Sequence, residues 1–599
     1  MGPTWQGICS GGDVGGDCDY DAGSCNAGYA GGATMTDTRD AAKATAEGSR
    51  DDGRGSGGNS SSRDGSGDVI GHGTWLDKLA YELVRREESL GRDTGMIIVE
   101  SGLGASGIPH IGSLGDAARA YGVKLALGNL GYDSKLVAYS DDLDGLRKVP
   151  DGLPASLEEH LARPVSLIPD PFSCHDSYGA HMSSILLDGL DRVGIEYEFR
   201  RAYDTYRQGL LRDQIHAILC RSAEIGEKIA EMVGQSKYQM SLPYFPVCES
   251  CSRLYTAQAV SYDKSARAVS YECRDTQMAG RAISGCGHSG CAKIDGGSLG
   301  KLAWKVEFAA RWAAFDVRFE AYGKDIMDSV RVNDWVAEHV LGYAPPHHAK
   351  YEMFLDKGGK KISKSAGNVL TAQRWLEFGS PQSILLLLYK RIAGARELGI
   401  REDVPSLMDE FNELEDVYFG RVRKELRGNP AKLAKARGLY LYANLLRPPE
   451  RPGAHVGYML AAKLARVYRT DRARRVVEKL LEYGTIPEPS PEVEELVRLA
   501  GNYADEFDEE GGSAEIAVDD NMRAALGSIA RMLDSGRGTP DDIQTGIYDA
   551  AKSCGAQPKD VFAALYQIIL GSRRGPRLGP FIADIGEARV SKMITERVS

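Results

Sequence analysis

The chain has 599 residues and a formal net charge of −11 at pH 7, which is long enough for three or four domains and for large cores that need no disulfides. This acidic balance excludes a uniformly basic coat for nucleic acid, although a local basic groove is compatible with it. The sequence has no apolar run of the roughly 20 residues that span a bilayer, and no basic-then-apolar secretory leader. We therefore expect a cytoplasmic multidomain protein in which some of the eleven cysteines bind metal.

Residues 1–72 are rich in Gly, Ser, Asp and Ala and nearly lack large aliphatic side chains. Such a segment cannot bury enough apolar surface to offset the entropy of ordering, so we expect a disordered tail. Its cysteines, Cys9, Cys18 and Cys25, are irregularly spaced and are interpreted as incidental thiols. A gene start assigned too far upstream would explain the tail equally well.

The folded part begins with residues 75–88, which have helical spacing, and residues 96–101, which form a short apolar stretch typical of a strand. Residues 116–132 then predict an amphipathic helix, and residues 134–142 predict a second strand that ends in aspartates. The order strand, helix, strand indicates a parallel α/β unit.

Polar residues follow both predicted strands. GIPHIGS (residues 107–113) comes after the first strand, and residues 140–144 close the second. In parallel sheets, ligands bind at the carboxyl ends of the strands. We therefore expect these two segments to share one cleft.

The rest of the chain divides into stretches of different character. Residues 156–235 predict mainly helices, and a turn-rich insertion with cysteines covers about 243–300. Strand and helix signals alternate again to 345, and beyond about 371 the signal is almost wholly helical. We place the boundaries at 1–72 for the tail, 73–370 for an α/β domain with insertions, and 371–599 for a helical region.

Two short motifs indicate nucleotide chemistry when they are taken together. His110-Ile111-Gly112-Ser113 alone is a weak signal, because a histidine in a glycine-flanked turn is usually structural. KISKS (residues 361–365) alone is better interpreted as a solvated basic loop. In this order and strand context, however, the pair resembles the double signature of class I aminoacyl-tRNA synthetases. FEAYGKD (residues 319–325) resembles the third element of that class.

Within that class, the resemblance narrows to the class I lysyl-tRNA synthetases. The segments that carry it are ESGLGASGIPHIGS, SDDLDGLRKVPDGLP, DPFSCHDSYGAH, WKVEFAARWAAFDVRFEAYGKD and GPRLGPFIADIG, and it extends from about residue 74 to the C-terminus. The resemblance implies a Rossmann-type parallel sheet with zinc-binding insertions, followed by an all-α anticodon-binding region. It also implies a lysine–tRNA ligase that uses ATP with Mg²⁺, L-lysine and tRNA(Lys).

Amino-acid activation is an in-line attack of a carboxylate on the α-phosphorus of ATP, so the protein mainly positions and neutralises charge. By resemblance, His110 would donate to the phosphates and Gly112 would let the nucleotide approach the backbone. Ser113 stands where the wider class usually has a second histidine. The other expected nucleotide contacts are Gly107, Gly323, Asp325, Lys361, Ser363 and Lys364, with the two lysines on the pyrophosphate.

Selection of lysine requires a desolvated carboxylate for the ε-ammonium and an apolar wall for the methylenes. The sequence alone does not identify this carboxylate. The candidates are Asp141, Asp142, Asp144 and Glu352, and of these we select Asp142 and Glu352. By resemblance, the walls are Gly102, Trp304 and Tyr351. Ordinary core packing explains the two aromatic residues equally well.

Two groups of residues have the composition of zinc sites. The first lies within about 165–185, and its predicted ligands are Asp170, Cys174, His175 and His181. A polar turn with unrelated histidines is the alternative for this group. The second lies within about 243–295, and its predicted ligands are Cys248, Cys251, Cys273 and Cys286, with His288 or Cys291 as substitutes. Cys220 and Cys554 are interpreted as core residues.

The resemblance also assigns the RNA contacts. The zinc-bearing insertions are expected to shape the region that receives the tRNA acceptor end, and the helical C-terminal third is expected to bind the anticodon. Arg573, Arg574 and Arg577 could contact phosphates, and a solvated basic turn is an equal alternative. The competing functions are a class I synthetase for another amino acid, glutamate first, and a non-catalytic zinc- and RNA-binding paralogue.

Overall fold

A computed structural model describes residues 69–359, 370–421, 426, 428–507, 519–536 and 538–598. Residues Val69–Ser599 form one compact unit. Nearly all of the expected tail, up to residue 68, lies outside the described residues. Among the helices that the structure describes, each is too short or too polar to cross a bilayer.

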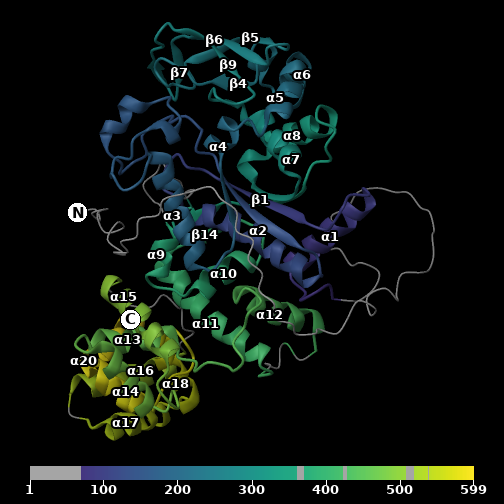
Figure 1. Cartoon of the computed structure of the whole chain (residues 1–599). Helices are drawn as coiled ribbons and strands as arrows, with labels where there is room; N and C mark the ends of the chain where they lie inside the picture. Colours follow the sequence, from purple (N-terminus) through teal and green to yellow (C-terminus); the bar gives the residue numbers. More distant parts are fainter. Residues whose placement is uncertain are drawn as a thin grey trace, which may run out of the picture. The chain divides into compact units, whose positions relative to one another are not determined.

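A five-stranded parallel sheet, in the order β12-β11-β1-β2-β3, forms the centre of this unit (Figure 1). Its strands are β1 (Ile97–Leu103), β2 (Ser134–Ser140), β3 (Glu198–Arg201), β11 (Val317–Gly323) and β12 (His347–Tyr351). Strand β1 lies in the middle, and its first five residues are all buried. A parallel strand with both faces covered has this continuous burial instead of an alternating pattern.

The predicted strand–helix–strand unit is confirmed by β1, α2 (Ile111–Asn129) and β2. Helix α2 begins at residue 111, five residues before the predicted start at 116. His110 is its N-cap, and the Nδ1 atom of His110 accepts a hydrogen bond from the backbone N–H of Ser113 at 3.3 Å. The glycines in this first turn weaken the helical signal of the sequence, whereas the cap supplies the partner that the first turn needs.

Helices cover both faces of the sheet. They are α1 (Trp75–Ser89), α3 (Tyr178–Arg192), α7 (Trp304–Phe315) and α8 (Met327–His339), with the short turn η5 (Lys324–Ile326) before α8. Val99 on β1 belongs to the core that contains α1, α2 and α3. Its neighbour Ile98 belongs to the core of α7 and α8, because successive side chains of a strand point to opposite faces.

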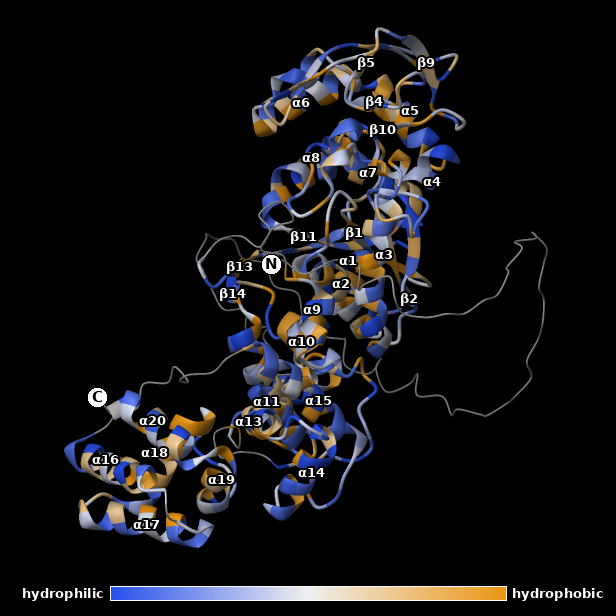
Figure 2. Ribbon diagram, turned by 90° about the vertical axis from the view of Figure 1, so that its left-hand side faces the viewer, coloured by the Kyte–Doolittle hydropathy of each residue, from blue (hydrophilic) through white to orange (hydrophobic). Residues whose placement is uncertain are grey.

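The segments between β2 and α7 form short helices and three small antiparallel sheets. Figures 1 and 2 place α7 between these small sheets and the central sheet. Their elements are η2 (Ala155–His160), η3 (Val165–Leu167), α4 (Ala202–Arg207), α5 (Arg212–Cys220), α6 (Ser222–Val233), η4 (Ser236–Gln239), β4 (Tyr244–Pro246), β5 (Ala257–Asp263), β6 (Ala268–Cys273), β7 (Thr276–Met278), β8 (Arg281–Ile283), β9 (Ser289–Lys293) and β10 (Gly300–Leu302). The regular structure within the insertion that the sequence marks as turn-rich is therefore β structure.

The predicted helical region beyond residue 371 is confirmed, with one short strand inside it. Its elements are α9 (Ala372–Leu376), α10 (Pro381–Tyr389), β14 (Arg396–Leu398), α11 (Ile400–Tyr418), α12 (Pro430–Ala443), α13 (Tyr458–Val467), α14 (Arg472–Glu482), α15 (Pro491–Glu506), α16 (Asp520–Asp534), α17 (Pro540–Ser553), α18 (Pro558–Leu570), α19 (Leu578–Ile585) and α20 (Glu587–Val598). Figure 2 shows apolar and polar residues on the same helices, as in amphipathic packing. Strand β14 pairs with β13 (Phe354–Asp356), so backbone hydrogen bonds cross the predicted boundary at 371.

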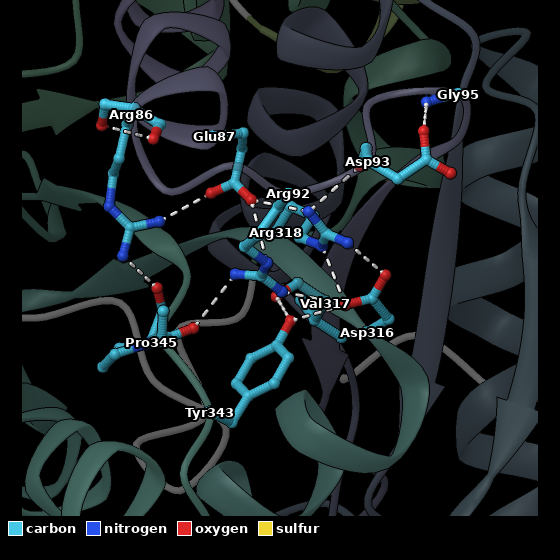
Figure 3. Close-up of polar contacts among 12 residues, drawn as sticks. Arg86, Glu87, Arg92, Asp93, Gly95, Asp316, Val317, Arg318, Tyr343 and Pro345 are labelled. Carbon is cyan, nitrogen blue, oxygen red and sulfur yellow. Dashed lines mark hydrogen bonds and ion pairs between the residues drawn. The ribbon is translucent and has the colours of Figure 1, made fainter.

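A buried ion network ties α1 to the amino end of β11 (Figure 3). The carboxylate of Glu87 is fully buried and lies 2.7 Å from Arg318, 2.7 Å from Arg86 and 3.3 Å from Arg92. Arg318 and Arg92 also contact Asp316. The network lies at the strand end opposite to Gly323, where β11 finishes, and it sets the position of β11 against α1.

Candidate active site

A cavity of about 410 Å³ opens at the carboxyl ends of the central strands and at the first turn of α2. The sequence-predicted residues that line it are Gly102, His110, Gly112, Ser113, Trp304, Gly323, Asp325, Tyr351 and Glu352. The cleft expected at this edge is therefore present, and it brings together segments more than 200 residues apart in the chain. Gly107 is buried beside it and does not line it.

The imidazole of His110 lies directly over Gly112. A Cβ atom at position 112 would stand 2.6 Å from Cε1 and 2.7 Å from Nδ1 of His110, which is closer than real Cβ contacts allow. Glycine at this position therefore lets the histidine cap α2 and face the cavity at the same time. The backbone N–H groups at a helix start carry partial positive charge, so this corner of the cavity favours an anion.

The end of β11 has a similar construction. A Cβ atom on Gly323 would lie 2.7 Å from Oδ1 of Asp325, so glycine gives room for this carboxylate at the rim of the cavity. A carboxylate at the end of a parallel strand is suited to accept hydrogen bonds from ribose hydroxyls.

Lys361, Ser363 and Lys364 lie outside the described residues. Residues that flank their segment are described, and they lie in or next to the wall of the cavity. Phe354 on β13 lines it, and the carbonyl of Leu370 accepts a hydrogen bond from the backbone N–H of Ile111 at 2.7 Å.

An acidic cluster surrounds Arg311 on the floor of the cavity. Arg311 is 1 % exposed, and its guanidinium lies 3.1 Å from Glu100, 3.2 Å from Asp141 and 3.4 Å from Glu320. The Nε1 atom of Trp312 donates to Glu320 at 2.5 Å. Three carboxyl groups therefore share one buried cation.

Burial in this cluster favours the protonated acids. Desolvation raises the pKa of Asp141 to about 8 and that of Glu100 to about 7, while Arg311 opposes both shifts. Because one guanidinium cannot neutralise three carboxylates, the cluster holds protons near neutral pH and can accept a further cation.

Gly102 leaves a hollow beside two of these acids. A Cβ atom at this position would lie 3.9 Å from a carboxylate oxygen of Asp141 and 3.9 Å from one of Glu320. Trp304 forms part of the wall, and its Nε1 atom donates to Asp144 at 3.3 Å. The hollow joins carboxylate oxygens to apolar surface, which is the combination that a long alkylammonium side chain requires.

The sequence-predicted carboxylates separate into different positions. Asp142 lies outside the cavity, where it accepts hydrogen bonds from Arg201 at 2.7 Å and from the backbone N–H of Tyr203 at 2.9 Å. Asp144 is bonded to Lys301 and Trp304. Asp141 lines the cavity, as does Glu352, which lies 3.2 Å from Lys324.

Several lining residues are missed by the sequence interpretation, among them Asp116, Arg119, Phe308, Arg311, Glu320 and Met353. Arg311 has a signal that could have been used, because it is a lone cation in the alanine-rich stretch FAARWAAF. Arg119 is 3 % exposed, and its guanidinium lies 4.3 Å from the ring centroid of Tyr351. Tyr351 therefore lines the cavity and also packs against a buried cation.

The first predicted metal group comes together at the start of α3. Asp170, Cys174, His175 and His181 each offer one ligand atom, and these atoms lie within 4.8 Å of one another. Backbone N–H groups of residues 172, 174 and 175 donate to Asp170 and lower its pKa, which fits a charged ligand. One carboxylate, one thiol and two imidazoles form a donor set that zinc accepts.

The second predicted group consists of four cysteines whose sulfur atoms also lie within 4.8 Å of one another, namely Cys248, Cys251, Cys273 and Cys286. A backbone hydrogen bond from residue 288 lowers the pKa of Cys286 to about 6, so this sulfur favours the thiolate that binds metal. His288 and Cys291, the alternative ligands, do not belong to this group. Cys220 and Cys554 are half-buried and lie apart from both groups.

A family model and two curated relatives point to the same family. The family model described as "tRNA synthetases class I (K)" matches residues 73–443. A lysine–tRNA ligase from Cenarchaeum symbiosum is 62 % identical over 531 residues, which is 89 % of this chain and 100 % of that protein. A lysine–tRNA ligase from Roseobacter denitrificans is 31 % identical over 86 % of this chain and 94 % of its own length. A solved glutamate–tRNA ligase from Elizabethkingia meningosepticum aligns with 84 % of this chain and 99 % of its own, at 12 % identity and a TM-score of 0.32.

Proposed function

This chain belongs to the class I lysyl-tRNA synthetases, and from this membership we propose that its cavity activates L-lysine with ATP and transfers it to tRNA(Lys). In the first step a carboxylate oxygen of lysine attacks the α-phosphorus of ATP, and pyrophosphate leaves. In the second, a ribose hydroxyl at the 3′ end of the tRNA, the 2′-OH in this class, attacks the adenylate and AMP leaves.

The acidic cluster around Arg311 is the observation that carries the choice of substrate. The hollow at Gly102 faces Asp141 and Glu320, which share Arg311 with Glu100. A lysine ε-ammonium placed there would take the place of the protons that burial holds on these acids and would stabilise their carboxylate form. A glutamate side chain would add a fourth carboxylate, so the geometry favours lysine over glutamate. Trp304 supplies the wall for the methylenes.

On the nucleotide side, His110 and the start of α2 would stabilise the phosphates, and Asp325 would hold the ribose. Lys361 and Lys364 would neutralise the pyrophosphate together with Mg²⁺. In support, Phe354, which precedes their segment, lines the cavity, and Leu370, which follows it, is hydrogen-bonded to Ile111 beside the cap of α2. This arrangement needs no nucleophilic side chain, because the substrates supply the attacking oxygens.

Two zinc ions are proposed as structural partners. The four-cysteine group and the group of Asp170, Cys174, His175 and His181 each provide the four ligand atoms of a closed tetrahedral site. Zinc in such sites supplies folding free energy, so the metal would hold the loops of the insertions in place.

The division of labour along the chain is also proposed. Residues 73–370 would carry the chemistry, and residues 371–599 would bind the anticodon arm of tRNA(Lys). We propose the cytoplasm, where tRNA is charged for translation, as the location of this activity.

Pyrophosphate exchange with ATP across all twenty amino acids, with and without tRNA, tests the proposal. We expect exchange with lysine alone among the twenty. Exchange with glutamate instead would overturn the choice of substrate. Silence in both conditions, with RNA binding retained, would overturn the catalytic assignment. The variant Asp141→Asn should raise the KM for lysine more than that for ATP.

A further inference from the structure

Behind Trp304, which forms part of the wall of the first cavity, lies a buried chain of charged side chains. Trp304 also lines a second cavity of about 380 Å³, and Asp144 and Lys301 line the second cavity but not the first. These two side chains therefore stand behind the indole ring as seen from the first cavity. The proposed reaction assigns no part to either of them.

The indole ring of Trp304 is held on two sides. Its Nε1 atom donates to Oδ1 of Asp144 at 3.3 Å, and the ring packs against Phe308 with centroids 5.5 Å apart. Rotation of the ring would leave the indole N–H without its partner, so the hydrogen bond resists that rotation. The position of the Asp144 carboxylate therefore determines the position of the wall.

Lys301 in turn fixes Asp144. Its Nζ atom donates to Oδ1 of Asp144, the same oxygen that accepts the indole N–H, and lies 2.9 Å from Glu307. The side chain of Lys301 is 2 % exposed, and that of Glu307 is fully buried. Burial favours the neutral amine, but Asp144 and Glu307 outweigh it and raise the pKa of Lys301 well above its usual range. Lys301 is therefore a buried cation with two carboxylates as partners.

The network continues into neighbouring elements on both sides. The hydroxyl of Tyr206 on α4 donates to Glu307 at 2.9 Å and accepts a hydrogen bond from the backbone N–H of Leu302 at 3.0 Å. On the other side, the backbone N–H of Asp144 donates to the carbonyl of Asp141 at 3.1 Å. One short segment thus carries both an acid of the first cavity and the hydrogen-bond partner of its apolar wall.

We propose that Lys301 and Asp144 are positioning residues, which hold Trp304 where the first cavity fits the methylene chain of lysine. The inference rests on the proposed function, because it assumes that lysine binds beside Trp304. Neither side chain touches the substrate, and both act through the indole ring. One methylene in an apolar pocket is worth about 10- to 200-fold in the selection of a substrate. Lys301 and Asp144 therefore contribute to the discrimination between lysine and its shorter homologue ornithine.

Pyrophosphate exchange with ATP in the presence of tRNA(Lys), measured with lysine and with ornithine, tests the proposal. Asp144→Ala removes the acceptor of the indole N–H. We expect it to raise the KM for lysine on the order of tenfold, to lower the preference for lysine over ornithine by a similar factor, and to leave the KM for ATP unchanged. Lys293→Met, an exposed lysine on β9 in the same insertion, is the matched control and should change none of these values.

Double variants separate positioning from folding. Trp304→Phe keeps an aromatic ring and removes the N–H that Asp144 accepts, so adding Asp144→Ala to it should raise the KM for lysine no further. Lys301→Met leaves Glu307 without its cation, so it should lower the melting temperature in both backgrounds. It should raise the KM for lysine only where Trp304 is present.

Losses that multiply in the double variants would overturn the proposal, because they would show that Asp144 and Lys301 do not act through the indole ring. An equal rise in the KM for ATP and for lysine would also overturn it. A wild-type enzyme that supports no exchange with lysine would instead overturn the proposed function itself, and this inference with it.

Discussion

At the residue scale, the contact between His110 and Gly112 decides how the cavity is built at the start of α2. The imidazole occupies the space that any side chain at position 112 would need. The motif therefore acts through the fit of its atoms as well as through hydrogen bonding. The glycine contributes because it has no side chain.

Gly112→Ala tests this steric role. The new methyl group would push the imidazole of His110 away from the cap of α2, and a misplacement of about 1 Å can cost about a hundredfold in rate. We expect kcat/KM for aminoacylation to fall by about that factor. Gly128→Ala, in the same helix with no atom within 4 Å of the added Cβ, should leave the rate unchanged. Equal rates for both variants would contradict the steric argument.

A second residue-scale prediction concerns protons. Burial raises the pKa of Asp141 to about 8, so at pH 7 this acid is mostly neutral in the free enzyme. An ammonium bound beside it stabilises the carboxylate and lowers that pKa, so lysine binding should release protons. Lysine affinity should therefore rise with pH up to about 8.

Titration calorimetry in buffers of different ionisation enthalpy measures this release. The observed binding enthalpy should vary with the buffer at pH 7 and should lose this dependence in Asp141→Asn. A wild-type enthalpy that is the same in every buffer would exclude a coupled proton at Asp141.

At the scale of elements, the position of β11 against α1 depends on charges buried within the sheet domain. Glu87 is fully buried and has Arg86, Arg92 and Arg318 around it, as Figure 3 shows. A buried carboxylate that loses an ion-pair partner still carries the free-energy cost of desolvation, which that partner no longer offsets. The network thus makes β11 sensitive to changes far from the cavity.

Arg318→Met should lower the free energy of unfolding by about 2 to 3 kcal/mol, below the range of about 3 to 5 for a fully orphaned charge because two arginines remain. Urea unfolding measures the change. Arg192→Met, which breaks an exposed pair with Asp188, should cost less than about 0.5 kcal/mol. Similar losses of the free energy of unfolding in the two variants would show that the buried network adds no stability beyond that of an exposed ion pair.

The metal groups give the second prediction at this scale. Elemental analysis should find two zinc ions per chain. Cys251→Ala should remove one ion and His181→Ala the other, each with a lower melting temperature. Cys291→Ser should keep both ions, because this cysteine lies outside the four-sulfur group. Loss of a zinc ion in Cys291→Ser would refute the ligand assignments. A wild-type protein without any bound zinc would refute them as well.

At the scale of the whole molecule, the helical region offers basic residues far along the chain from the catalytic motifs. Arg574 lines a cavity of about 350 Å³ with Asp409 and Thr485. Arg577 lies 2.9 Å from Asp541 and is partly neutralised. Arg573, Arg574 and Arg577 are therefore not equally suited to contact RNA phosphates.

The double variant Arg573→Ala with Arg574→Ala should raise the KM for tRNA(Lys) about tenfold and reduce the salt dependence of binding, while the KM for lysine stays constant. Arg577→Ala should have a smaller effect because of its ion pair with Asp541. A raised KM for lysine in the double variant would indicate a structural defect instead of a lost RNA contact.

Local patterns predicted much of this protein. Residues 96–142 alone indicate a parallel strand–helix–strand unit, because apolar runs and helical spacing report burial directly. GIPHIGS, KISKS and FEAYGKD predict a nucleotide site, since these motifs need particular backbone shapes and charges within a few residues. Residues of the first and third motifs line the cavity, and the second lies outside the described residues. The two metal groups were also predictable, because most of their ligands are close in sequence.

Which of the candidate carboxylates face the cavity was decided only by the tertiary structure. Asp141 and Asp142 are neighbours in the chain, yet Asp141 faces Arg311 in the cavity and Asp142 is bound by Arg201 outside it. The partners that separate them are 170 and 59 residues away. Sequence determined which short segments carry charge and glycine, whereas the packing of distant helices determined which of those charges are buried together, because desolvation depends on neighbours in space.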